Sequence, residues 1–145
     1  MDEQIVLCIQ QKLVLMTNIL NLSKQIEVRC SQPEIELGNL LQDRKVYMDR
    51  FDKCSTLLSK LTAELPSEEK EHMEQLLGGK AEPEDCSGEE LSILKSVRKF
   101  NDYLQQAIAL DKNATKHMKK QCDELRVTIN KQRKTQENTS LYNIH

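Results

Sequence analysis

Apolar residues return at every third or fourth position through three long stretches of this 145-residue chain. That spacing keeps one face of an α-helix apolar and leaves the opposite face to solvent. Only 4 Gly and 3 Pro are present, too few for the many turns of a β protein. The chain is therefore predicted to be all-α, with long helices and few breaks.

The first predicted helix covers residues 3–29. Its apolar positions form one broad stripe: Ile5, Ile9, Leu13, Met16 and Leu20, with Leu15, Ile19, Leu22 and Ile26 beside them. Ser31 and Glu34 then have the spacing of a capping box, with Pro33 in the first turn of the next helix. A connection this short predicts that the second helix folds back antiparallel to the first.

The second predicted helix covers residues 33–64 and carries a heptad pattern. The repeating positions are Leu37, Leu41, Arg44, Met48, Phe51, Ser55, Leu58, Thr62 and Leu65, and Leu40, Tyr47, Cys54 and Leu61 widen the stripe on one side. A stripe this wide favours packing against two partners, and so a three-helix core. Arg44 is expected to snorkel, with its methylenes packed and its guanidinium in water.

A short helix from Pro66 to Leu77 follows, closed by Gly78 and Gly79. Ser87 and Glu90 form a second capping box, which opens a third helix reaching about Arg133. Its repeating positions are Leu94, Val97, Asn101, Leu104, Ile108, Asp111, Thr115, Met118, Cys122, Leu125 and Ile129. The predicted fold is an antiparallel three-helix bundle with coiled-coil-like helices and an extra short helix, in one domain over 1–134. Residues 135–145 lack periodicity and are predicted to form a flexible tail.

The lengths of the predicted helices are unequal. At about 1.5 Å per residue, the first two span roughly 40 to 45 Å and the third nearly 70 Å. The end of the third helix would extend beyond the hairpin, leaving Met118, Cys122, Leu125 and Ile129 uncovered. An exposed stripe of this width fits one partner helix, which Lys119, Lys120 and Arg126 would flank. The alternatives are a loop over 66–87 that carries the chain back, a bent helix, or a homodimer in which two copies cover each other.

Charge, hydropathy and cysteine usage narrow the function further. The net charge of −2 and pI near 6.0 give no reason to expect a nucleic-acid ligand, although Glu64–Glu90 is locally acidic and Lys112–Lys134 basic. Those charges are interpreted first as solvated helix faces. No uncharged apolar run approaches the roughly 18 residues of a membrane span, so membrane insertion is not expected. The five cysteines contain no C-x-x-C pair and are expected to be reduced, in a cytoplasmic protein.

Catalytic and metal-binding patterns are absent from the sequence. No phosphate-binding loop or nucleophile motif occurs, so the chain is predicted not to be an enzyme and to need no cofactor. His117 with Gln121 and Cys122, and His72 among glutamates, come nearest to metal ligands, and both histidines are interpreted as structural. A polar site in the core remains an alternative for three positions, which are otherwise interpreted as setting helix register: Asn101, Asp111 and Thr115.

Two segments resemble FlgN-type flagellar export chaperones. The run from Leu40 to Phe51, LLQDRKVYMDRF, is similar to the L-L-x-x-R-x-x-L-[IM]-x-x-[IL] stretch of that family's second helix. The run from Leu110 to Asn113 looks like the family's acidic-x-Asn step, and a basic amphipathic run and a terminal Tyr142 follow. This chain departs from the pattern at Tyr47, where an aliphatic residue is commoner, and at Asn143, where Gly often follows the tyrosine.

The resemblance implies a small cytosolic chaperone without catalytic residues. Such proteins bind helical terminal segments of flagellar hook-associated (hook–filament junction) proteins and deliver them to the type III export apparatus. The family engages its substrate through the C-terminal helix, where the uncovered stripe is expected here. The alternative function is a structural coiled-coil module, or helical adaptor subunit, of a larger assembly.

Overall fold

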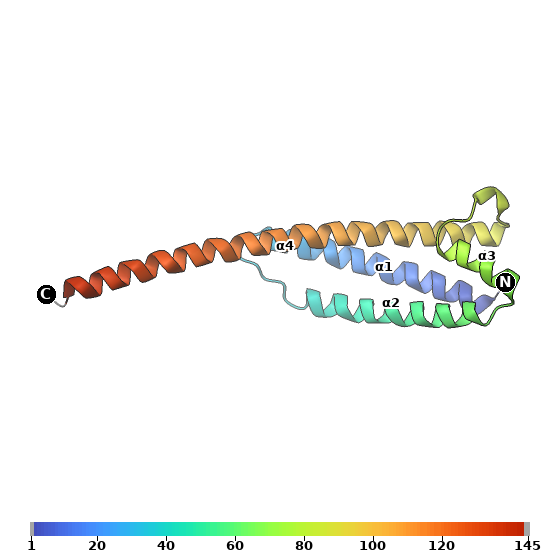
Figure 1. The fold of residues 1–145 in the computed structure, drawn as a ribbon, viewed down its shortest axis with the longest axis horizontal. Coiled ribbons are helices and arrows are strands. Elements are labelled where there is room, and N and C mark those ends of the chain that lie inside the picture. The colour runs from blue at the N-terminus through green and yellow to red at the C-terminus, as the bar shows by residue number, and fades with distance from the viewer. Residues whose placement is uncertain (1, 144–145) are drawn as a thin grey trace.

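The computed structural model describes residues 2–143, with side chains as far as Thr139. It contains four α-helices, α1 (Glu3–Cys30), α2 (Leu40–Ala63), α3 (Ser67–Leu77) and α4 (Gly88–Asn143), and one 3-10 turn, η1 (Pro83–Asp85) (Figure 1). These residues include no strand. The predicted all-α fold is therefore confirmed for the described part of the chain.

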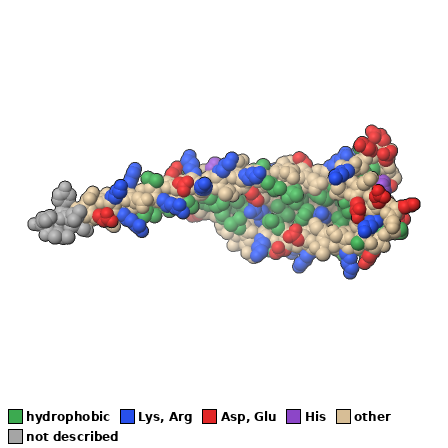
Figure 2. All heavy atoms as spheres, viewed as in Figure 1, with side chains coloured by type: hydrophobic (Ala, Val, Ile, Leu, Met, Phe, Trp, Pro, Cys, Tyr) green, Lys and Arg blue, Asp and Glu red, His purple; other side chains and the backbone are tan. Residues whose placement is uncertain are grey.

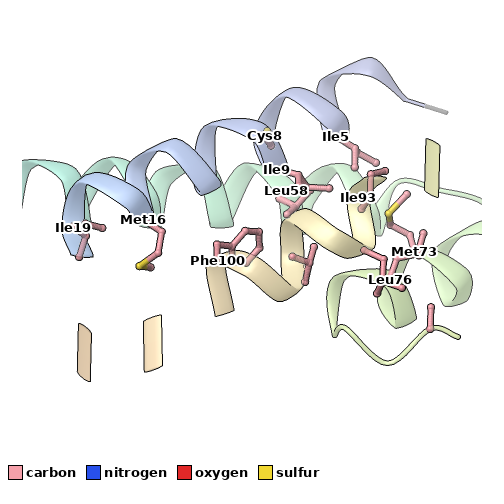
Figure 3. Packing of buried hydrophobic residues seen from close by; sticks show 13 residues of the cluster. Ile5, Cys8, Ile9, Met16, Ile19, Leu58, Met73, Leu76, Ile93 and Phe100 are labelled. Atoms are coloured by element: carbon pink, nitrogen blue, oxygen red, sulfur yellow. The ribbon is translucent and has the colours of Figure 1, made fainter. Parts of the chain in front are cut away.

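α1 packs along both α2 and α4, whereas α2 and α4 contact each other only sparsely. α2 returns beside α1, and α4 follows the pair and continues well past the connection between them (Figure 1). The main hydrophobic cluster takes residues from all three long helices (Figure 3). Its central members are Ile5, Ile9, Met16 and Ile19 of α1, Leu58 of α2, and Ile93, Leu94, Val97 and Phe100 of α4.

The predicted short helix is confirmed as α3, which closes the end of the cluster where the chain begins. Met73 and Leu76 are buried there against the long helices (Figure 3). Gly78 ends the helix, and Gly79 has a φ of +69°, a left-handed conformation that glycine adopts without steric cost. The Arg98 guanidinium donates hydrogen bonds to the carbonyl oxygens of Gly79 and Ala81, which fixes the connection against α4.

The start of α4 is also as predicted. The Glu90 backbone N–H donates to Ser87 Oγ at 3.3 Å, which is the first half of the capping box. The Glu90 carboxylate also contacts His72 of α3, so it joins the two helices.

The predicted start of the second helix was wrong. α2 begins at Leu40, and the capping box at Ser31 does not form. Ser31 instead ends α1, where its hydroxyl donates to the Val28 carbonyl at 2.7 Å. Gly38 has a φ of +55°, a left-handed conformation that interrupts a right-handed helix, so the regular helix starts only after it.

The heptad stripe of the second helix is less buried than its pattern predicts. Only Leu40, Leu58 and Thr62 of α2 are buried, while Leu41 and Met48 each keep 47% of their surface exposed. The reason is that α2 has one extensive neighbour, α1, where the pattern had suggested two.

The snorkelling predicted for Arg44 is also wrong. Its guanidinium donates to Ser23 Oγ of α1 at 3.1 Å and pairs with Asp111 Oδ1 of α4 at 2.5 Å. The Arg44 side chain is only 16% exposed. Arg44 therefore connects all three long helices at one level.

The flexible tail predicted from residue 135 is corrected as well, because α4 continues without a break to Asn143. Residues 135–139 contain no Gly or Pro that would end a helix. The hydroxyls of Thr135 and Thr139 donate to carbonyl oxygens four residues earlier. The missing apolar period therefore indicates that this stretch lacks a packing partner, and it does not indicate a loss of helix. The side chain of Tyr142 lies outside the described residues.

α1 is the one helix in the described residues that is long and apolar enough to cross a membrane by length and composition. Its most apolar 18-residue window has a mean hydropathy of 1.5, and a third of that window is buried. Core helices of soluble proteins and signal sequences near an N-terminus have the same composition. In this fold α1 is the helix that contacts both other long helices.

Replacing Arg44 by alanine should destabilise the fold. The substitution removes two charge-assisted hydrogen bonds, to buried Ser23 and to Asp111, but Asp111 is 48% exposed and regains water. We expect a loss of about 1 to 2 kcal/mol, below the full value of a buried charged hydrogen bond. Urea unfolding followed by circular dichroism measures it, with the exposed neighbour Lys45→Ala as control. Equal losses in both variants would contradict a specific role for Arg44.

The stability that the contact between Glu90 and His72 contributes should depend on pH. The hydrogen bond from His72 is the main cause that lowers the pKa of Glu90 below its ordinary 4.5. A carboxyl whose pKa is lower in the folded chain stabilises the fold above its unfolded pKa, and this contribution is lost as pH falls through the folded pKa. The difference in melting temperature between the native chain and Glu90→Gln should therefore be largest above pH 4.5 and vanish at lower pH. A difference independent of pH would refute this assignment.

Candidate protein-binding site

No helix of the described chain packs against the C-terminal part of α4. From Cys122 to Thr139 every side chain is exposed. Leu125 is 61% and Ile129 40% exposed. Steps of three and four residues put Cys122, Leu125 and Ile129 on one face of the helix, and we refer to these three as the projecting stripe. Large apolar side chains in such a row are typical of a surface that binds another chain.

Met118, the first residue of the predicted stripe, belongs partly to the core. It is half-buried against a second hydrophobic cluster, which lies at the end of the helical hairpin where the loop joins α1 to α2. The buried members of this cluster are Ile26, Cys30, Leu40 and Ala114. The predicted partner-binding residues are therefore divided, with Met118 at the edge of the core and the projecting stripe free.

The loop between α1 and α2 forms a wall beside the stripe. The Gln121 side-chain amide donates to the Gln32 carbonyl at 2.6 Å. His117 Nε2 lies 3.7 Å from Glu27 Oε1, one turn earlier on α4. Between this loop and α4 is an open groove of 860 Å³. Its apolar lining comes from Ile35, Met118, Cys122 and Leu125.

The two edges of the projecting stripe differ in charge. On the loop side the groove is lined by Glu34, Glu36 and Glu124. The other edge carries an exposed cation at every seventh position, and we call these residues the basic column: Lys112, Lys119, Arg126 and Arg133. In the described part of the chain none of the four forms an ion pair within 4.0 Å. Lys119 and Arg126 were predicted to flank the stripe, whereas 100° of rotation per residue places Lys120 on the far side of α4.

The arrangement of titratable groups offers no site for a metal ion. Within the residues that the structure describes, no three His, Cys, Asp or Glu side chains gather closely enough to hold one. His72 and His117 each contact a single glutamate, and each contact joins two parts of the fold. Of the polar positions predicted in the core pattern, Asp111 is engaged by Arg44, while Asn101 and Thr115 are exposed.

The five cysteines are free thiols in different environments. Burial raises the pKa of Cys8 and of Cys30 above the ordinary 9.0, which favours the unreactive thiol form. Cys122 is the exposed member of the set and lies on the projecting stripe. Its sulfur can therefore report on whether that surface is covered.

The sequence pattern did not reveal two parts of this surface. Leu104 and Ile108 were expected to be covered by the hairpin, yet they are 36% and 40% exposed. The wall that contains Ile35 lies in a segment expected to be helical. Exposure of the first pair depends on the distance between α2 and α4, for which the sequence carries no local signal.

Comparisons of the chain with family models, with curated proteins and with solved structures gave no match.

Alkylation with iodoacetamide should modify Cys122 fastest. Thiol reactivity follows exposure and the thiolate fraction; Cys8 and Cys30 are the buried cysteines, and burial raises the pKa of each. Mass spectrometry of digested samples over a time course gives the rate at each cysteine, and a Cys122→Ser variant identifies the fast phase. Equal rates at Cys122 and Cys8 would show that the projecting stripe is covered or that the core is open.

Proposed function

We propose that this chain is a helix-binding protein, and specifically a cytosolic export chaperone of the FlgN type. Its substrates would be helical terminal segments of flagellar hook–filament junction proteins, held before they enter the type III export apparatus. The supporting arrangement is an antiparallel three-helix bundle of α1, α2 and α4, with α3 as the extra short helix. No catalytic residue and no cofactor belong to this function.

The observation that carries the proposal is the projecting stripe. It extends from a helix whose N-terminal half is anchored by buried Leu94, Val97 and Phe100, so its position is held without a partner. A preformed surface avoids the entropic cost of ordering on binding. An amphipathic helix is the natural ligand, since its own apolar face matches a row of side chains at three- and four-residue steps.

The resemblance supports the more specific part of the proposal. The run that resembles the family's second helix contains Arg44, which joins α2 to Asp111, within the acidic-x-Asn step. The two resembling segments thus contact each other at the level where α4 begins to leave the hairpin.

Substitution of Leu125 by aspartate tests the proposal. Leu125 is at the centre of the stripe, and a charge there should weaken binding of a junction-protein terminal segment about 30-fold or more, as expected for an interface hot spot. Isothermal titration calorimetry with the purified segment measures the affinity. Because Leu125 is 61% exposed, the melting temperature should not change.

Val127→Asp is the matched control. Val127 is 54% exposed but faces away from the stripe, two residues from Leu125, and its substitution should leave the affinity unchanged. If the native chain binds no junction-protein segment, the export-chaperone proposal is wrong. If both variants lose affinity equally, the projecting stripe is not the binding surface.

A helical adaptor subunit is the second candidate, and one observation favours it. Leu7, Val14 and Val28 of α1 are 55%, 61% and 54% exposed and lie at multiples of seven residues, with Asn21 at the position between the two valines. This row could pack against another helix of a larger assembly. Sedimentation velocity distinguishes the two functions, because an adaptor subunit would self-associate or unfold at low concentration while a chaperone would remain a folded monomer.

A further inference from the structure

Apolar side chains beside the contacts between α2 and α4 remain exposed. Two of these contacts are the aromatic pair of Phe51 and Phe100, with ring centroids 6.2 Å apart, and the ion pair of Arg44 with Asp111. Met48 lies between Arg44 and Phe51 on the same face of α2 and is 47% exposed. Figure 2 shows hydrophobic side chains gathered in the band between the two helices.

This open surface is continuous with the projecting stripe. Leu104 and Ile108, the inner stripe, are separated from Cys122, Leu125 and Ile129 by steps that keep the heptad pattern. The distance along α4 from Leu104 to Ile129 is about 38 Å. One straight partner helix could therefore contact both stripes without bending.

Polar groups lie between the two stripes. Ile108, Asp111, Lys112 and Thr115 line one shallow hollow on α4. Asp111 keeps 48% of its side chain exposed although it pairs with Arg44. A helix lying across this hollow would place a polar residue near its middle, because Arg44 satisfies only one carboxylate oxygen of Asp111 and an apolar side chain would bury the other acceptor sites unpaired.

The basic column gives the partner's charge. Lys112, Lys119, Arg126 and Arg133 repeat every seven residues along one edge of the same face, so they would face one flank of a helix bound there. An acidic residue at every seventh position of that flank would match them. A second copy of α4 is a poor match, since antiparallel pairing would bring two basic columns together.

We infer that exposed Met48, Leu104 and Ile108, which we call the α2–α4 surface, and the projecting stripe form one continuous site for an amphipathic partner helix of another protein, acidic along the flank that faces the basic column. This inference rests on the proposed helix-binding function and extends it inward, to the inner stripe and Met48. It also names the partner chemistry, which is an apolar heptad stripe with one polar interruption and a Glu or Asp at every seventh position.

Two synthetic peptides of about four heptads test the inference. Both carry leucine at the stripe positions with one central asparagine, and they differ only in having Glu or Lys at the flanking position of each heptad. Fluorescence anisotropy with the full chain should show that the Glu peptide binds at least about 10-fold more tightly than the Lys peptide. The variant Lys112→Glu, Lys119→Glu, Arg126→Glu should reverse this preference.

Substitutions in the α2–α4 surface test the inference separately from the proposed function. Ile108→Asp and Met48→Glu should each weaken binding of the Glu peptide about 10-fold. Leu57→Asp is the control, since Leu57 is 47% exposed on the opposite face of α2, and it should bind as the native chain does. Circular dichroism confirms that all three variants keep their helicity.

Three outcomes would overturn the inference. If Leu125→Asp abolishes binding while Ile108→Asp and Met48→Glu bind normally, the partner contacts only the projecting stripe. The proposed function then stands without the further inference. If Leu125→Asp also binds normally, the proposed function fails with the inference. If sedimentation shows that the native chain is a dimer and that Ile108→Asp is a monomer, the partner on the α2–α4 surface is a second copy of this chain.

Discussion

The apolar surface of α1 must be covered from two sides, and the positions of the other helices follow from this. α2 covers one side and α4 the other, and burial of side chains such as Ile5, Ile9 and Met16 is worth roughly 1.5 to 3 kcal/mol each. The aromatic pair and the ion pair that join α2 to α4 each include an α1 side chain as well. Lys12 Nζ lies 4.8 and 4.9 Å from the rings of Phe51 and Phe100, and Ser23 accepts from Arg44.

Both junctions place polar chemistry inside the apolar core. Burial lowers the pKa of Lys12, because a charged ammonium loses its water, while the faces of two aromatic rings partly replace that water. Ser23 is 1% exposed and is satisfied by the Arg44 guanidinium. In the described part of the chain no buried side-chain nitrogen or oxygen lacks a hydrogen-bond partner. Such groups favour one register of the helices, since sliding a helix by one turn would leave a buried donor or acceptor unpaired.

The unequal lengths of the helices have a functional consequence. α1 ends at Cys30 and α4 continues to Asn143, so one half of α4 is held by the core, while the other half has the end of α1 and the α1–α2 loop beside its first turns and is exposed from Cys122 to Thr139. The anchored half fixes the direction of the free half. The same packing leaves α2 and α4 with few mutual contacts, and a surface that includes exposed Leu104 and Ile108 leads toward the free half. We regard the α2–α4 surface and the projecting stripe as one surface. It exists because α2 and α4 both pack on α1 and make few contacts with each other.

The predictions that depended on local rules were mostly correct. The predicted bounds of α1, α3 and the start of α4 were correct within a few residues. The signals that set them are the apolar period, Gly78 and the Ser87 cap, and each depends on residues within one or two helical turns. The start of α2 was wrong because a capping box competed with Gly38, and the sequence does not show which of two local signals prevails. The predicted end of α4 was wrong because an apolar period marks the part of a helix that packs against a neighbour. A helical segment without a packing partner needs no such period.

The sequence by itself thus determined that the chain is helical, which faces of the helices are apolar, and that the last helix is longer than its neighbours. Only the tertiary structure decided how far apart α2 and α4 lie, that Arg44 pairs with Asp111, and that Leu104 and Ile108 remain exposed. The physical reason is range. Backbone hydrogen bonds and side-chain period act within a few residues, whereas the separation of two helices depends on how all the side chains between them fit together.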